Sequence, residues 1–68
     1  LAEREKAACS LARLLARRGA ARMHLKEYKS AHEDCQAAAG LYGEVGQKKP
    51  AQALEADLVK LAAFLPNE

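Results

Sequence analysis

A very short connection between two helical patterns constrains this 68-residue chain more than any other feature. Helical spacing of apolar residues covers residues 2–25 and 30–45, which leaves residues 26–28, with Lys29 at most, for the corner. So short a connection favours two antiparallel helices that pack along each other. Alanine and leucine are abundant and β-branched residues are rare, which is typical of helices. We therefore predict an all-α fold built on a helical hairpin.

The first predicted helix, residues 2–25, carries one apolar stripe that we expect to be buried. Its members are Ala8, Leu11, Leu14, Leu15, Ala21 and Leu25. Gly19 lies in the middle of this helix, where glycine costs about 1 kcal/mol relative to alanine. A second helix that crosses closely at this point would explain the glycine.

The second predicted helix, residues 30–45, begins with Ser30 and Glu33 in capping-box spacing, and Gly46 is suited to closing it. Its predicted buried face consists of small and medium side chains, namely Ala31, Cys35, Ala38, Tyr42 and Val45.

The third predicted helix, residues 50–65, begins at Pro50 and is stopped by Pro66. Its predicted buried face consists of Leu54, Leu58, Leu61 and Leu65, widened by Val59 and Phe64. A hairpin with a third helix makes one small all-α unit. Because the chain starts at Leu1 and both ends are abrupt, we expect residues 1–68 to be a fragment of a larger domain.

Positive charge is concentrated in the first half of the chain. Residues 1–30 hold eight Lys and Arg against three acidic residues, whereas residues 31–68 hold three against six. This asymmetry predicts a basic face directed at an anionic partner. One basic row on the first helix consists of Arg13, Arg17, Ala20 and His24, and the neighbouring row consists of Arg18, Arg22 and Lys26.

No set of residues in the chain predicts catalysis. His32 and Cys35 lie one turn apart, but two ligands are too few for a structural zinc site. Cys35 lies on the predicted buried face, where a thiol is usually inert, and the adjacent Glu33 and Asp34 point in different directions. Cys9 and Cys35 lack metal or redox spacing, so we expect reduced thiols in a cytoplasmic protein. We predict no enzyme activity, no cofactor and no metal.

The hairpin, residues 12–43, resembles a tetratricopeptide repeat, a helix–turn–helix unit of about 34 residues. The matching positions are a small residue in the first helix, an aromatic residue at the corner and two alanines of the second helix: Gly19, Tyr28, Ala31 and Ala38. The family often has tryptophan, leucine, tyrosine, phenylalanine and proline where this chain has Leu15, Arg18, Arg22, Cys35 and Gly43. In this register residues 50–65 correspond to a capping helix or to the first helix of a next repeat.

The run from Arg13 to Ala20, followed by Tyr28, Ala31 and Asp34, is similar to the third repeat of co-chaperone tetratricopeptide domains. In those domains a lysine and an arginine one turn apart help to clamp the acidic C-terminal tail of heat-shock chaperones. Arg13 falls on the lysine position and Arg17 on the arginine position, while other clamp residues belong to two preceding repeats. The resemblance implies a co-chaperone or adaptor module whose peptide site includes Arg13, Arg17, Ala20, Met23 and His24.

Other interpretations of the basic helix stay open at this stage. Arg13 and Arg17 are also explained as a solvated face, because arginine favours helices and extends its charge into water. Stacked repeats normally need three or more units, so the chain is alternatively a scaffold that pairs with a second copy as a homodimer. Nucleic acid and membrane are disfavoured, because recognition motifs, interleaved aromatic residues and large apolar anchors are missing. We therefore predict a protein partner.

Overall fold

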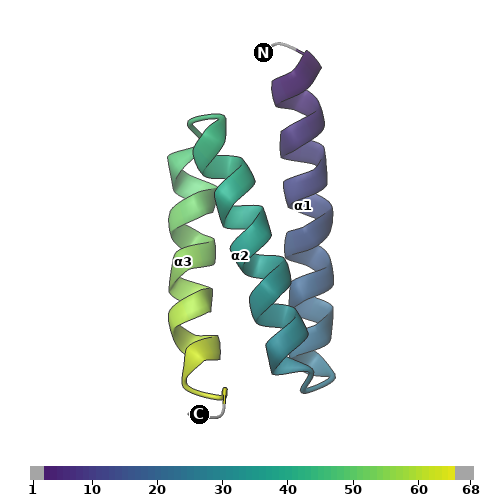
Figure 1. The fold of residues 1–68 in the computed structure, drawn as a ribbon, viewed down its shortest axis with the longest axis vertical. Helices are drawn as coiled ribbons and strands as arrows, with labels where there is room; N and C mark the ends of the chain where they lie inside the picture. Colours follow the sequence, from purple (N-terminus) through teal and green to yellow (C-terminus); the bar gives the residue numbers. More distant parts are fainter. Residues whose placement is uncertain (1–2, 66–68) are drawn as a thin grey trace.

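The computed structural model describes residues 3–65, which form three α-helices joined by two tight turns (Figure 1). The helices are α1 (Glu3–His24), α2 (Tyr28–Glu44) and α3 (Lys48–Ala62). No strand occurs within the described residues, so the predicted all-α fold is confirmed. α2 lies between the other two helices and packs along both, whereas α1 and α3 barely touch. The result is an elongated row of helices with extents of 40 × 18 × 18 Å.

Both turns close the preceding helix with the same backbone arrangement. After α1, the Glu27 N–H donates to the Arg22 carbonyl over 2.8 Å, and Lys26 adopts a left-handed φ of 64°. After α2, the equivalent hydrogen bond is 2.9 Å long, and Gly46 is the left-handed residue with a φ of 77°. This arrangement is the Schellman motif, in which glycine is the usual left-handed residue. The predicted role of Gly46 is confirmed, and Lys26 takes the same role at a position without glycine.

The start of α2 differs from the prediction. The helix begins at Tyr28, and Glu27 occupies the N-cap without any side-chain capping hydrogen bond. The predicted capping box of Ser30 and Glu33 is therefore wrong, and the corner is residues 25–27 rather than 26–28. The physical reason is the turn itself, because a Schellman motif reverses the chain within three residues and the next helix starts at once.

The bounds of α3 are also shifted relative to the prediction. The helix begins at Lys48, so Pro50 is its third residue rather than its first. It ends at Ala62, and residues 63–65 form a turn instead of a last helical turn. Pro66, the predicted stop, lies outside the described residues.

α1 and α2 cross closely at Gly19, as the sequence predicted. A Cβ atom at Gly19 would lie 2.9 Å from the Cys35 Sγ and 3.3 Å from the Ala31 carbonyl oxygen. The second of these atoms belongs to the backbone, so it moves aside only if α2 shifts. Ala12, Ala31 and Ala38 are completely buried around the crossing. The hairpin is therefore packed through small residues, and any side chain at Gly19 would push the two helices apart.

The predicted faces of the second and third helices are buried or half-buried as expected, including Leu54, Leu58 and Leu61 of α3 and Leu65 in the turn after it. The prediction that Val59 and Phe64 widen the face of α3 is wrong, because these side chains are 74% and 59% exposed. The Phe64 ring instead stacks on the Tyr28 ring, with 4.6 Å between the ring centroids. This contact joins the turn after α3 to the start of α2.

The predicted buried stripe of α1 is largely wrong, because Leu11, Leu14, Ala21 and Leu25 are exposed. The helix turns Ala12 and Gly19 toward α2 instead, and Leu15, Ala16 and Met23 lie half-buried beside them. The close crossing at Gly19 sets this rotation, since only the small-residue side of α1 fits against α2. As a result, Leu11 and Leu14 lie on an exposed flank of α1.

Candidate peptide-binding face

α1 carries two pairs of arginines, and each pair spans one helical turn. Arg13 and Arg17 form one pair, and Arg18 and Arg22 form the other. A helix rotates by roughly 100° per residue, so the two pairs lie on opposite flanks of the line through Ala12 and Gly19 that faces α2. A single side chain of α2 can therefore contact only one of the two arginine pairs.

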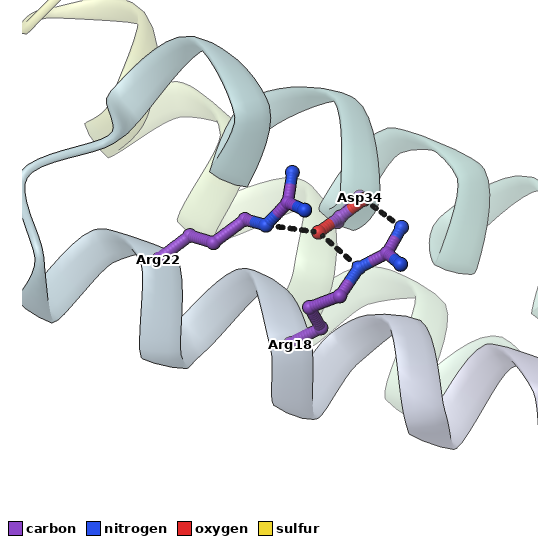
Figure 2. Close-up of polar contacts among 3 residues, drawn as sticks. All are labelled: Arg18, Arg22 and Asp34. Atoms are coloured by element: carbon purple, nitrogen blue, oxygen red, sulfur yellow. Dashed lines mark hydrogen bonds and ion pairs between the residues drawn. The ribbon is translucent and has the colours of Figure 1, made fainter.

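Asp34 of α2 binds both members of the Arg18–Arg22 pair (Figure 2). The Arg18 Nε donates to Asp34 Oδ2 over 2.9 Å, and its Nη2 donates to Oδ1 over 2.8 Å. The Arg22 Nε lies 3.5 Å from the same Oδ2. The Asp34 side chain is only 7% exposed, whereas the Arg18 side chain is 56% exposed. One carboxylate is thus shared by two cations at the edge of the α1–α2 interface.

The shared contact keeps Asp34 ionised. The hydrogen bonds from Arg18 lower the pKa of Asp34, and the charges of Arg18 and Arg22 act in the same direction, while burial opposes them. The same hydrogen bonds and the charge of Asp34 raise the pKa of Arg18. Both shifts favour the charged pair at neutral pH, and in this form the contact links α1 to α2.

Sequence reasoning missed this contact, because Arg18 and Arg22 were assigned to a basic surface row. One signal for it was present in the sequence. Asp34 follows Ala31 by three residues and precedes Ala38 by four, so it shares a side of the helix with two residues of the predicted buried face. A buried carboxylate needs a charged partner, and arginines on the facing helix were the available ones.

The residues of the predicted peptide site differ in how far they are exposed to solvent. Arg13 and Arg17 are exposed, and neither makes an ion pair within residues 3–65. Ala20 and His24 are exposed on the same flank. Met23 is half-buried and packs against the core instead of joining that row. We call the exposed residues Arg13, Arg17, Ala20 and His24 the basic row.

The remaining reactive groups do not form a second candidate site. Cys9 and Cys35 are free thiols, and burial raises the pKa of Cys35, with the charges of Asp57 and Asp34 acting in the same direction. A raised pKa disfavours the reactive thiolate. No group of three or more His, Cys, Asp and Glu side chains in residues 3–65 is placed to hold a metal ion. Across the same residues, no helix combines the length and apolar character that crossing a bilayer requires.

The basic row is chemically suited to binding carboxylates. Each guanidinium can donate two parallel hydrogen bonds to one carboxylate, and the one-turn spacing presents two such groups side by side. Comparison with models of protein families gives no match, and neither the curated proteins nor the solved structures give a significant match. Function is therefore inferred from the geometry of α1 and from the residues that line it.

Proposed function

We propose that the chain is a protein–protein interaction module that binds an acidic peptide through Arg13 and Arg17. The observation that carries the proposal is the contrast between the two arginine pairs. Arg18 and Arg22 share a carboxylate within the fold, whereas Arg13 and Arg17 have no acidic partner within residues 3–65. Two exposed guanidinium groups held one turn apart on a packed helix present a pre-arranged site for two carboxylates of an extended peptide.

The finer proposal follows the resemblance to the co-chaperone tetratricopeptide domains. The module would belong to a cytoplasmic co-chaperone or adaptor, and the peptide would be the acidic C-terminal tail of a heat-shock chaperone. Arg13 at the family's lysine position replaces a compact ammonium with a planar fork, so we expect a preference for carboxylates that can be bound by both nitrogens. Ala20 and His24 continue the basic row and would contact peptide residues upstream of the tail.

A titration with labelled peptide tests this proposal. A peptide ending in Glu-Glu-Val-Asp with a free carboxyl terminus is compared with a scramble of the same composition, at about 50 mM and about 150 mM salt. We expect saturable binding that prefers the native order and persists at the higher salt. The double variant Arg13→Ala/Arg17→Ala should weaken it by roughly fivefold or more. Equal binding of both peptides that fades with salt would contradict the proposal.

A matched control removes the same charge elsewhere. Lys48→Ala/Lys49→Ala eliminates two exposed cations at the start of α3, away from the basic row. This control should leave the preference for the native peptide unchanged. An equal loss of affinity in both double variants would mean that only net charge matters.

A second candidate function is a scaffold that self-associates without binding peptide. Leu11 and Leu14 of α1 and Leu25 of the following turn favour it, because they are 49%, 62% and 69% exposed on one side of the molecule. Sedimentation over a range of concentrations would then show a dimer, and Arg13→Ala/Arg17→Ala would not affect its formation.

A further inference from the structure

The exposed leucines of α1 belong to a continuous stripe. Residues separated by alternating intervals of four and three fall on one side of a helix. In α1 and the turn after it, the residues with this spacing are Ala7, Leu11, Leu14, Arg18, Ala21 and Leu25. We call them the leucine stripe. Single exposed leucines are common, but a row at this spacing is the pattern of a seam between two helices.

The leucine stripe lies away from the side of α1 that packs against α2, although its Arg18 side chain reaches back to Asp34 of α2. α2 contacts the side of α1 that carries Ala12 and Gly19, and α3 lies on the far side of α2 (Figure 1). Leu14 lies more than 90° around α1 from both of these buried residues, at roughly 100° per residue. The three leucines of the stripe, Leu11, Leu14 and Leu25, are therefore 49%, 62% and 69% exposed among residues 3–65.

The charges around the leucine stripe identify the kind of partner that fits. Arg18 lies within the stripe, and Arg17 and Arg22 lie on either side of it. α1 as a whole carries two glutamates, both in its first turn, against six Lys and Arg residues: Arg4, Lys6, Arg13, Arg17, Arg18 and Arg22. Arg18 and Arg22 share the single negative charge of Asp34, so this flank of α1 keeps a net positive charge, and a second copy of the stripe would bring the same excess against it. A seam with acidic flanks would complement it.

We propose that the leucine stripe binds an amphipathic helix of another protein, whose apolar seam is flanked by Asp and Glu. Leu11 and Leu14 insert between apolar side chains of that helix, and Arg17, which has no acidic partner within residues 3–65, pairs with one of its carboxylates. This surface goes beyond the proposed peptide site, because that site uses an extended acidic tail on the basic row. Arg17 borders both surfaces, but Arg13 lies more than 90° around the helix from Leu11 and Leu14 at roughly 100° per residue, so substitutions of Arg13 and of the two leucines test the surfaces separately.

The test uses the full 68-residue chain and three labelled peptides of about 21 residues, three heptads in length. The first peptide has a leucine seam with glutamate flanks, the second has the same seam with lysine flanks, and the third has glutamate flanks with serine in the seam. We expect the first peptide to bind roughly tenfold or more tightly than the other two.

Variants of the chain locate the binding surface. Leu11→Ser/Leu14→Ser should weaken binding of the first peptide by roughly tenfold or more, since two apolar contacts are lost. Val59→Ser, at an exposed valine of α3, and Arg13→Ala should each leave it unchanged. Leu14→Gln, which retains helix propensity, should weaken binding with the helical circular dichroism intact.

Several outcomes would overturn the proposal. Unchanged affinity of Leu11→Ser/Leu14→Ser would show that the leucine stripe is not the binding surface. A dimer of the chain that those substitutions abolish would show that the stripe pairs with a second copy. Binding to phosphatidylserine vesicles without any preference among the three peptides would assign the stripe to a membrane surface.

Discussion

The two arginine pairs of α1 contain the same residue type at the same spacing, yet they have different surroundings. Arg18 and Arg22 share the carboxylate of Asp34 and link α1 to α2, whereas Arg13 and Arg17 extend into solvent. The difference comes from α2, which places its buried carboxylate on only one flank of α1. A row of basic residues on one helix therefore indicates a binding site only after the acidic groups of the neighbouring helix have been located.

The largest expected effect comes from separating the two helices that create this contrast. Gly19→Val places side-chain atoms where Cys35 and the Ala31 carbonyl already lie, so α1 and α2 must move apart and Arg18 loses its reach to Asp34. We expect the free energy of unfolding to fall by about 1–3 kcal/mol or more. Urea denaturation followed by circular dichroism measures it.

Gly40→Ala is the control for that substitution, because a Cβ at Gly40 would meet no atom within 4 Å beyond its chain neighbours and the nearby backbone of its own helix. It should raise the free energy of unfolding by about 0.5–1 kcal/mol, as alanine favours the helix. Comparable destabilisation by both substitutions would contradict the close crossing at Gly19.

A smaller effect is expected when the carboxylate alone is removed. Asp34→Asn makes the two arginine pairs alike by leaving Arg18 and Arg22 without an acidic partner. We expect the Tm at pH 7 to fall by roughly 5 °C, because charge-assisted hydrogen bonds at the interface are lost. Glu33→Gln removes the adjacent exposed carboxylate and should leave the Tm unchanged. Equal Tm values for both variants would show that the ion pair does not hold the helices together.

The contribution of Asp34 should also depend on pH in a defined direction. Its pKa is lowered in the folded chain, so the stability it confers is fully present above the unfolded pKa of about 3.9. This contribution is lost as the pH falls through the lowered folded pKa. The Tm difference between the parent chain and Asp34→Asn should therefore shrink on acidification, and a difference that stays constant would assign it to packing.

The smallest expected effect on stability is that of Arg13→Ala/Arg17→Ala. Exposed side chains without partners contribute little, so the Tm should stay within about 2 °C of the parent value. Arg18→Ala/Arg22→Ala should lower the Tm by more than that, since it leaves Asp34 buried without a cation. Thermal denaturation of the two double variants side by side measures this difference. An equal fall in Tm would show that both arginine pairs contribute equally to stability.

The sequence predicted the helices and two of their faces because α2 and α3 each have one dominant apolar side. α1 has two such sides, one of alanine and glycine and one of leucine, and periodicity alone does not tell which faces α2. The side containing Gly19 is buried because it allows the closest approach. The capping box at Ser30 was a local pattern that the tight turn before Tyr28 overrode. The contact between Arg18 and Asp34 spans 16 residues, so it depends on how the helices pack.

Nuclear magnetic resonance of the arginine side chains tests the central claim most directly, because each Nε–H group gives its own signal. Acidic tail peptide is added to ¹⁵N-labelled chain, and the signals of Arg13, Arg17, Arg18 and Arg22 are followed. We predict saturable shifts of the Arg13 and Arg17 signals, while the Arg18 signal stays where its hydrogen bond to Asp34 places it. Shifts confined to Arg18 and Arg22, equal shifts of all four signals, or no shift at any peptide concentration would contradict the proposed role of Arg13 and Arg17.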